Sequence, residues 1–190
     1  MIGVVLAGGA SSRMGVAKAI VELGGVPLAE HALAPLRAAG LEVAVVAKDG
    51  DALPELDAPV WRESRPERHP LAGILEALER GGGSAVLACA CDMPFVTPEL
   101  VAHLARSPGT AVPEAGGRLH PLLARYDPGT TGGLRDAFEA RAPLHDAVRA
   151  AGATIVSEAE LARFGDPARL LFNVNTPADL ARASEMLGSA

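Results

Sequence analysis

Basic residues are in the minority in this chain of 190 residues, which has 17 Lys and Arg against 23 Asp and Glu and a formal net charge of −6. Proteins whose main ligand is DNA or RNA usually have a basic surplus or a basic stripe. The sequence has neither, so we expect no nucleic-acid partner. An acidic chain can still bind a nucleotide, provided that local cations or a metal ion lie beside the phosphates.

Long apolar runs are also missing, although 49% of the residues are hydrophobic. No run approaches the roughly 18 residues that a membrane-spanning helix needs, so we expect no membrane partner. The apolar N-terminus lacks the basic segment and the long hydrophobic core of a signal peptide, and it is typical of a first strand. These features predict a cytoplasmic protein.

Cysteine is scarce, and the two that are present, Cys89 and Cys91, are separated by a single residue. On a strand both would point to the same face, where they make poor disulfide partners. A metal site would need a second pair of Cys or His at usable spacing, which the sequence lacks. We therefore interpret both as small buried apolar residues, in keeping with a reducing compartment.

Strands alternate with helices over the first half of the chain. This order favours an α/β fold of the Rossmann-like kind, with a mostly parallel central sheet between two layers of helices. We expect one domain, 1–190, with a nucleotide-binding half over about 1–107 and an acceptor-binding half over about 108–190. Expected strands are Ile2–Leu6, Leu41–Ala47, Val60–Trp61, Ala85–Cys89, Thr110–Pro113, Leu119–Tyr126 and one around Ile155; expected helices include Leu28–Ala39, His69–Arg80, Pro98–Ala105 and Pro177–Leu187.

The most informative segment is a loop rich in glycine and serine that follows the first expected strand and runs from Leu6 to Lys18. Its glycines let the backbone approach a ligand and present N–H groups to phosphate, while Arg13 and Lys18 add positive charge. The glycine spacing does not match a dinucleotide fingerprint, and Ala19 after the lysine excludes a Walker loop. The chain is therefore neither an ordinary dehydrogenase nor a P-loop NTPase.

This loop, L-A-G-G-x-S-x-R-M-G-x-x-K-A, resembles the signature of the molybdenum cofactor guanylyltransferases, which belong to the larger NTP-transferase group. Three further matches follow in the same order, P-L-A-G at Pro70–Gly73, C-D-M-P-F-V at Cys91–Val96 and F-N-V-N-T-P-x-D-L at Phe172–Leu180, so the resemblance covers the whole chain. One departure is Ala17, where the family often has an acidic residue. The resemblance implies that the loop wraps the NTP phosphates, with backbone contacts from Leu6, Ala7, Gly8 and Gly9 and charge neutralisation by Arg13 and Lys18.

Asp92 follows the fourth expected strand of the nucleotide-binding half, Ala85–Cys89. An acidic residue at the carboxyl end of a parallel strand lies in the crevice where open α/β sheets bind ligands. One carboxylate, together with phosphate oxygens and waters, is the usual way to hold Mg²⁺. The resemblance assigns the same magnesium role to Asp92, and the other interpretation is a turn cap before Met93.

Glu63, after the third expected strand, is the candidate for base recognition. A carboxylate can accept hydrogen bonds from both N1–H and N2–H₂ of guanine, a pattern that no other common base presents. The family usually has an aspartate near this position and often an asparagine where Lys48 stands. Both residues can also be read as ordinary solvated charges. The L-A-G-G start of the loop resembles guanylyltransferases more than the cytidylyltransferases of the same pathway.

The resemblance places the acceptor near residues contributed by both halves of the chain. His69, at the start of an expected helix, stands where the family usually has glycine, and it either adds a donor or crowds the site. Asn173 and Asn175 would face the same way on an extended segment, where they suit a pterin edge or cap the following turn. The expected acceptor-binding residues are Gly15, His69, Gly73, Asn173 and Asn175, with His120 as a weaker candidate.

The resemblance implies that the terminal phosphate of molybdopterin attacks the α-phosphate of GTP and expels pyrophosphate. Catalysis would rest on positioning and charge stabilisation by Arg13, Lys18 and Asp92. We therefore expect a Mg²⁺-dependent guanylyltransferase that acts on GTP and molybdopterin as a monomer or weak homo-oligomer, with proteins of the cofactor pathway as candidate partners. The alternatives are transfer from CTP, a sugar phosphate as acceptor, and a non-catalytic nucleotide-binding module.

Overall fold

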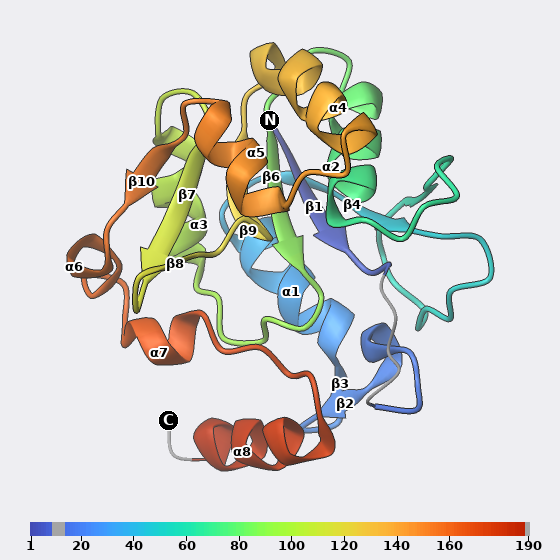
Figure 1. Ribbon diagram of the computed structural model, residues 1–190. Helices are drawn as coiled ribbons and strands as arrows, with labels where there is room; N and C mark the ends of the chain where they lie inside the picture. Colours follow the sequence, from blue (N-terminus) through green and yellow to red (C-terminus); the bar gives the residue numbers. More distant parts are fainter. Residues whose placement is uncertain (9–13, 189–190) are drawn as a thin grey trace.

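A twisted central sheet forms the middle of the protein in a computed structural model, which describes residues 1–8 and 14–188 (Figure 1). Its strand order is β10-β7-β9-β6-β1-β4-β5, with β8 paired to β7 beside this path. The pairs β1–β4, β1–β6, β4–β5 and β7–β10 are parallel, and β9 is antiparallel to both of its neighbours. The predicted mostly parallel sheet is confirmed.

The strands of this sheet are short, and those at its centre are buried on both faces. They are β1 (Ile2–Leu6), β4 (Glu42–Ala47), β5 (Val60–Arg62), β6 (Val86–Ala90), β7 (Ala111–Ala115), β8 (Arg118–Leu119), β9 (Leu123–Tyr126) and β10 (Thr154–Val156). A separate small hairpin consists of β2 (Glu22–Leu23) and β3 (Val26–Pro27).

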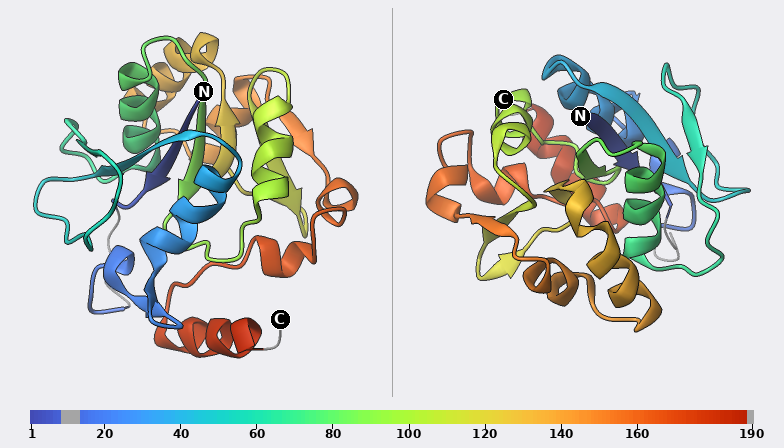
Figure 2. Two further views of the ribbon diagram at one scale, coloured as in Figure 1. Left: turned by 180° about the vertical axis from the view of Figure 1, so that it is seen from behind. Right: turned by 90° about the horizontal axis from the view of Figure 1, so that it is seen from above.

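Helices cover both faces of the sheet, as the views in Figure 2 show. One apolar core lies between the sheet and helices α1 and α3, and a second lies between the opposite face and helices α2, α4 and α5. This is the predicted three-layer arrangement. The helices are α1 (Leu28–Ala38), α2 (Pro70–Arg80), α3 (Pro98–Arg106), α4 (Thr131–Glu139), α5 (Leu144–Ala150), α6 (Glu158–Leu161), α7 (Pro167–Leu170) and α8 (Pro177–Gly188), with 3₁₀ turns η1 (Lys18–Ile20) and η2 (Pro128–Thr130).

Two helices begin with a side-chain cap followed by a proline. Thr97 caps α3, where its Oγ1 accepts a hydrogen bond from the N–H of Leu100, and Pro98 occupies the first turn. α2 begins in the same way at Pro70, but its cap is His69, whose Nδ1 accepts a hydrogen bond from the N–H of Leu71. Within the described parts of the chain, no helix is both long and apolar enough to cross a membrane.

The expected single strand Leu119–Tyr126 is wrong. β8 ends at Leu119 and β9 begins at Leu123, with a turn between them that is closed by the N–H of Leu123 and the carbonyl of His120. Pro121 has no N–H to donate to a ladder. The interruption lets the chain leave the hairpin with β7 and insert β9 beside β6, which places an antiparallel strand within the sheet.

The carboxyl ends of β1, β4 and β6 meet at one edge of the sheet because these strands are parallel neighbours. The N–H of Ala7 donates to Val46, and the N–H of Cys91 donates to Leu6, so the three chain segments stay together past the strand ends. This edge therefore brings together the segments that begin at Ala7, Lys48 and Cys91.

Candidate nucleotide and acceptor site

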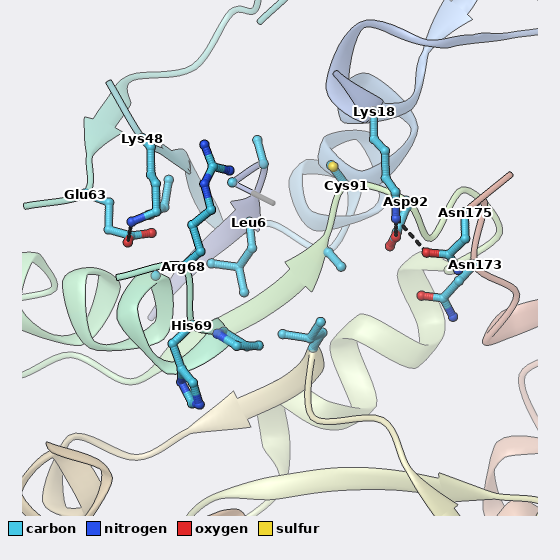
Figure 3. Close-up of a pocket in the computed structure, with 17 residues that line it drawn as sticks. Leu6, Lys18, Lys48, Glu63, Arg68, His69, Cys91, Asp92, Asn173 and Asn175 are labelled. Atoms are coloured by element: carbon cyan, nitrogen blue, oxygen red, sulfur yellow. Dashed lines mark hydrogen bonds and ion pairs between the residues drawn. The ribbon is translucent and has the colours of Figure 1, made fainter. Parts of the chain in front are cut away.

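A cavity of about 400 Å³ opens at this edge of the sheet (Figure 3). Its walls come from the ends of β1, β4 and β6, the loop before α2, the start of α2 and the segment before α8. The cavity has two polar ends, one around Lys48 and Glu63 and the other around Lys18 and Asp92. Its lining residues are Leu6, Ala7, Gly8, Lys18, Val46, Lys48, Glu63, Arg68, His69, Pro70, Gly73, Ala90, Cys91, Asp92, Leu122, Asn173 and Asn175.

At the polar end around Lys18 and Asp92, the Lys18 side chain links the turn after β6 to the segment before α8. Its Nζ donates to Oδ2 of Asp92 over 2.7 Å and to Oδ1 of Asn175 over 2.6 Å. The three residues come from η1, from the turn after β6 and from the segment before α8. Residues that are far apart in the sequence thus form one cluster with a cation beside a carboxylate.

The second oxygen of this carboxylate is a candidate ligand for a cation. Oδ1 of Asp92 is buried and accepts no hydrogen bond from the described residues. A buried carboxylate oxygen without a donor is costly unless a ligand compensates it. Asp92 is one of the residues that line the cavity, and carboxylate oxygens are hard ligands of the kind that Mg²⁺ prefers. Asp92 therefore has the chemistry to hold the ion that the sequence predicts.

Asn173 and Asn175 both line the cavity, as the alternation along an extended segment predicts. The side-chain amide of Asn173 donates to the carbonyl of Leu171 over 2.7 Å, which leaves its Oδ1 as an acceptor for a ligand. Asn175 accepts from Lys18, which leaves its NH₂ as a donor. The pair therefore offers a ligand one acceptor and one donor.

Asp179, in the first turn of α8, braces the segment that carries these asparagines. Its Oδ2 accepts hydrogen bonds from the N–H groups of Asn175 and Thr176 and from the hydroxyl of Thr176. These bonds, that of the Thr176 hydroxyl foremost, hold the pKa of Asp179 below its usual value. The segment is thereby fixed before it reaches the cavity.

Lys48 and Glu63 form a buried ion pair at the other polar end, with Nζ 2.5 Å from Oε1. The Glu63 side chain is only 5% exposed, so the interpretation of this residue as an ordinary solvated charge is wrong. Burial raises the pKa of Glu63, and the hydrogen bond and charge of Lys48 oppose that rise. The pair places a carboxylate where a base edge can reach it.

Two glycines keep space open in front of this carboxylate. A Cβ added to Gly8 would lie 3.8 Å from Oε2 of Glu63, and one added to Gly73 would lie 3.6 Å from the same oxygen. The Gly73 Cβ would also come within 3.3 Å of the Leu6 side chain. Both glycines line the cavity together with Glu63, and we call the space beside Oε2 that their missing Cβ atoms leave the slot.

His69 and Arg68 lie at the rim of the cavity, beside the start of α2. Because Nδ1 of His69 caps the helix, Nε2 is the ring nitrogen left for a ligand. Arg68 was not among the candidates from the sequence. Its guanidinium makes no hydrogen bond or ion pair within residues 1–8 and 14–188. Arg68 lies in a polar loop that contains no motif, so the sequence does not mark it as a site residue. It adds a cation to the rim of the cavity.

Several sequence candidates lie elsewhere. Gly15 does not line the cavity, and its positive φ of 72° gives a separate, conformational reason for glycine at that position. His120 does not line the cavity either; burial, with the nearby charge of Arg118, lowers its pKa. Gly9 and Arg13 lie outside the described residues, so their expected phosphate contacts stay predictions.

Cys89 and Cys91 are free and buried in the core between the sheet and α1, as predicted. Burial raises the pKa of both thiols, and that of Cys91 rises to about 12. Cys91 borders the cavity next to Asp92. A thiol that stays protonated and buried contributes packing and no nucleophile.

Comparison with known proteins gives a consistent result. A family model described as the MobA-like NTP transferase domain matches residues 3–155. A probable molybdenum cofactor guanylyltransferase of Pelotomaculum thermopropionicum is 34% identical over 97% of this chain and 92% of its own length. A protein of the same name from Chloroflexus aggregans is 35% identical over 100% of this chain and 96% of its own length. Molybdopterin-guanine dinucleotide biosynthesis protein A of Archaeoglobus fulgidus has a similar structure, with a TM-score of 0.84, 26% identity and full coverage of both chains.

Proposed function

The chain belongs to the family of MobA-like NTP transferase domains, and we propose that it transfers GMP from GTP to the terminal phosphate of molybdopterin. The observation that carries this proposal is the cavity itself, with a Lys–Asp–Asn cluster at one end and a buried carboxylate beside two glycines at the other. One end suits phosphates and the other suits a base. The names of the full-length relatives support guanine as that base.

The reaction needs no protein nucleophile. An anionic phosphate oxygen of the acceptor attacks the α-phosphorus of GTP, a P–O–P bond forms, and the bond to the β-phosphate breaks so that pyrophosphate leaves. Such transfers depend on positioning and on stabilisation of charge. Residues that hold phosphates in place are therefore sufficient, and a general base is not required.

Lys18 and Asp92 carry the charge stabilisation in this proposal. Lys18 is held by Asp92 and Asn175 with its ammonium at the cavity wall, so it offers positive charge to the α-phosphate and to the departing pyrophosphate. Mg²⁺ bound to Asp92 would supply further positive charge to the phosphate oxygens. Arg13 is proposed as a second phosphate cation on the strength of the sequence motif.

In this proposal Glu63 recognises the base of GTP, and the two asparagines recognise the pterin of the acceptor. We assign the N1–H and N2–H₂ edge of guanine to Glu63, with Leu6, Ala7, Gly8 and Gly9 beside the nucleotide. The acceptor and donor left by Asn173 and Asn175 suit the mixed donors and acceptors of a pterin ring. His69 is proposed on the acceptor side. Gly73, expected there from the sequence, lies beside Oε2 of Glu63 and is assigned to the base slot instead, and Gly15 does not line the cavity.

The test is turnover with purified molybdopterin, Mg²⁺ and each of GTP, CTP, ATP and UTP. Pyrophosphate release and the mass of the product are both measured. A guanine dinucleotide formed from GTP supports the proposal, and a cytosine dinucleotide keeps the chemistry but contradicts the base. Binding of GTP without pyrophosphate release would favour the non-catalytic module, and turnover with a sugar phosphate alone would contradict molybdopterin as acceptor.

A further inference from the structure

Lysine is rare in this chain, and its placement is informative. Of the 17 basic residues only Lys18 and Lys48 are lysines. Within residues 1–8 and 14–188, three basic side chains line the cavity, and both lysines are among them, with Arg68 as the third. A sequence that uses arginine almost everywhere else has an ammonium group at each polar end of the site.

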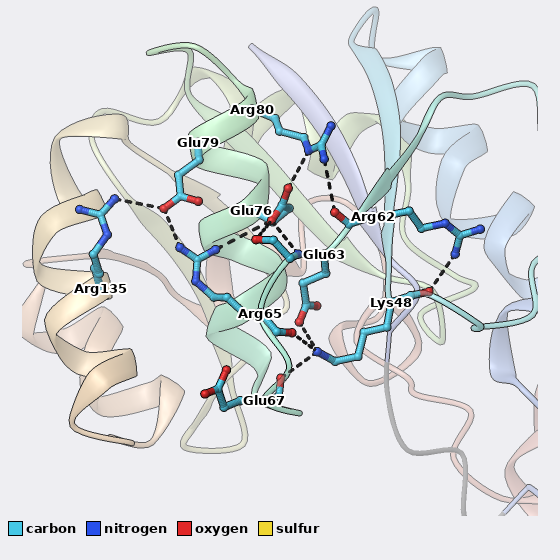
Figure 4. Close-up of polar contacts among 10 residues, drawn as sticks. Lys48, Arg62, Glu63, Arg65, Glu67, Glu76, Glu79, Arg80 and Arg135 are labelled. Carbon is cyan, nitrogen blue, oxygen red and sulfur yellow. Dashed lines mark hydrogen bonds and ion pairs between the residues drawn. The ribbon is translucent and has the colours of Figure 1, made fainter.

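Three acceptors surround the ammonium group of Lys48 (Figure 4). Its Nζ donates to Oε1 of Glu63 over 2.5 Å, to the carbonyl of Arg65 over 2.7 Å and to the carbonyl of Glu67 over 2.8 Å. An ammonium has three N–H donors, so this set uses all of them. Lys48 has no donor left for a ligand.

This geometry explains why the residue is lysine. The three acceptors converge on a single nitrogen, which suits a compact ammonium with three donors. An arginine spreads its donors over a planar fork and cannot direct three of them from one atom. The side chain therefore ties the end of β4 to the loop 63–69 between β5 and α2, which we call the β5–α2 loop.

The opposite side of the β5–α2 loop is tied to α2. The N–H and the hydroxyl of Ser64 both donate to Oε2 of Glu76, over 3.1 Å and 2.9 Å. The guanidinium of Arg65 donates to Glu79 and lies 5.8 Å from the ring centre of Phe138. These contacts hold the β5–α2 loop against α2. On the β4 side, Lys48 holds the carboxylate of Glu63 and two backbone carbonyls of the same loop.

We propose that Lys48 is a positioning residue for base selection, which holds Glu63 with Oε2 directed into the slot between Gly8 and Gly73. The inference rests on the proposed use of GTP. Lys48 does not touch the base; it orders the carboxylate that does. Inosine triphosphate lacks the N2 amino group of GTP. Because Glu63 is the acceptor for N2–H₂, the preference for GTP over inosine triphosphate depends on how firmly Lys48 holds the Glu63 carboxylate in place.

The charges around Glu63 add a second, independent signature. Lys48 on the segment after β4 is the cation that lowers the pKa of Glu63, whereas Asp51 in the same connector and Glu76 on α2 raise it, as does burial. Loss of Lys48 therefore raises the pKa further. The ionised carboxylate is the form that accepts hydrogen bonds from guanine. As the pH is lowered, a variant without Lys48 should therefore begin to lose GTP affinity at a higher pH than the wild type.

A double-mutant cycle tests the proposal. Dissociation constants for GTP, inosine triphosphate and CTP are measured by calorimetry from about pH 5 to about pH 8 for the wild type, Lys48→Met, Glu63→Gln and the double variant. We expect Lys48→Met to lose roughly tenfold in GTP affinity, the scale of one oriented hydrogen bond to a charged group, with a smaller loss for inosine triphosphate. In the Glu63→Gln background the same substitution should have no further effect.

Arg37→Met is the matched control, because Arg37 also pairs with a carboxylate, that of Glu30, and donates to a backbone carbonyl, that of Asp57, away from the cavity. It should leave all three constants unchanged. Lys48→Arg keeps the charge and covers the case in which Lys48→Met does not fold. It should lose part of the preference for GTP over inosine triphosphate while its pH profile stays close to that of the wild type.

The outcomes separate this inference from the proposed function. A wild type that binds no GTP overturns both. A wild type that prefers GTP, together with a Lys48→Met variant that keeps that preference and the wild-type pH profile, overturns the role of Lys48 alone. Additive losses in the cycle, or a Lys48→Arg variant with full preference for GTP, also overturn it.

Discussion

The ammonium group of Lys18 lies 2.7 Å from Oδ2 of Asp92, although 74 positions separate the two residues in the sequence. The parallel pairing of β1 with β6 brings the ends of these strands to the same edge of the sheet. Asp92 follows β6 at this edge, and the contact brings η1, which begins at Lys18, to the same place. One oxygen of Asp92 is thus held by a cation, and the other is left buried without a donor from the described residues. The pair is the centre of the proposed catalytic site.

Asp92→Asn should lower kcat by roughly 10²-fold or more, the scale of losing one preorganised electrostatic element. The amide keeps the size of the side chain but removes the charge that we propose binds Mg²⁺. Turnover is measured across a magnesium titration, with Asp49→Asn as the control because the Asp49 side chain is 90% exposed. Near wild-type turnover of Asp92→Asn at saturating magnesium would remove this residue from its proposed role.

Gly73→Ala should weaken GTP binding by roughly tenfold without loss of fold stability. The new methyl group would stand 3.3 Å from the Leu6 side chain and 3.6 Å from Oε2 of Glu63, in the slot proposed for the base. Alanine in a helix is intrinsically favourable by about 1 kcal/mol relative to glycine, so thermal unfolding should not shift downward.

Gly132→Ala in α4 is the control for this substitution, since a Cβ there meets nothing within 4 Å. It should leave GTP binding unchanged. Equal GTP affinities for Gly73→Ala and the wild type would place the base elsewhere in the cavity.

GTP affinity of the wild type should fall as the pH is lowered through the pKa of Glu63. Burial raises that pKa above the usual 4.5, so the loss begins at a higher pH than for an exposed glutamate. The sign follows from linkage: below its pKa the free protein carries a proton that guanine binding must displace. Calorimetry at several pH values measures the GTP affinity. The Glu63→Gln variant should lack the pH dependence that titration of Glu63 causes. An affinity that rises on acidification would contradict the assignment.

Much of the fold is predictable from local patterns. The buried strands β1, β4 and β6 and the proline-started helices α2 and α3 have strong local signals in the sequence. The insertion of β9 between β6 and β7 is not predictable in this way, because strand order depends on pairings between distant segments. The same limit applies to the site: the motif residues Lys18 and Asp92 stand out, but their contact is long-range.

The base end of the cavity shows this limit most clearly. The position of Glu63 after an expected strand makes it a candidate, but its ion pair with Lys48 crosses a polar connector without periodicity. Arg68 lies in the β5–α2 loop with no motif of its own. Their roles depend on how that loop folds against β4 and α2, which local sequence does not specify.

Thr97→Ala should cost about 1 kcal/mol in the free energy of unfolding, because the first turn of α3 loses its cap. The hydroxyl of Thr97 accepts from the N–H of Leu100, and the residue does not line the cavity. Urea unfolding measures the loss. Nucleotide binding at low temperature should be unchanged, and a loss of GTP affinity without a change in stability would contradict this purely structural role.

The most direct test of the central claim follows a phosphorus label. GTP labelled at the α-phosphate, and separately at the γ-phosphate, is incubated with the protein, Mg²⁺ and molybdopterin, and the products are separated. Guanylyl transfer predicts that the α-label moves into a molybdopterin dinucleotide and the γ-label leaves as pyrophosphate. Transfer of the γ-label to the acceptor, or appearance of both labels only in hydrolysis products, would contradict it.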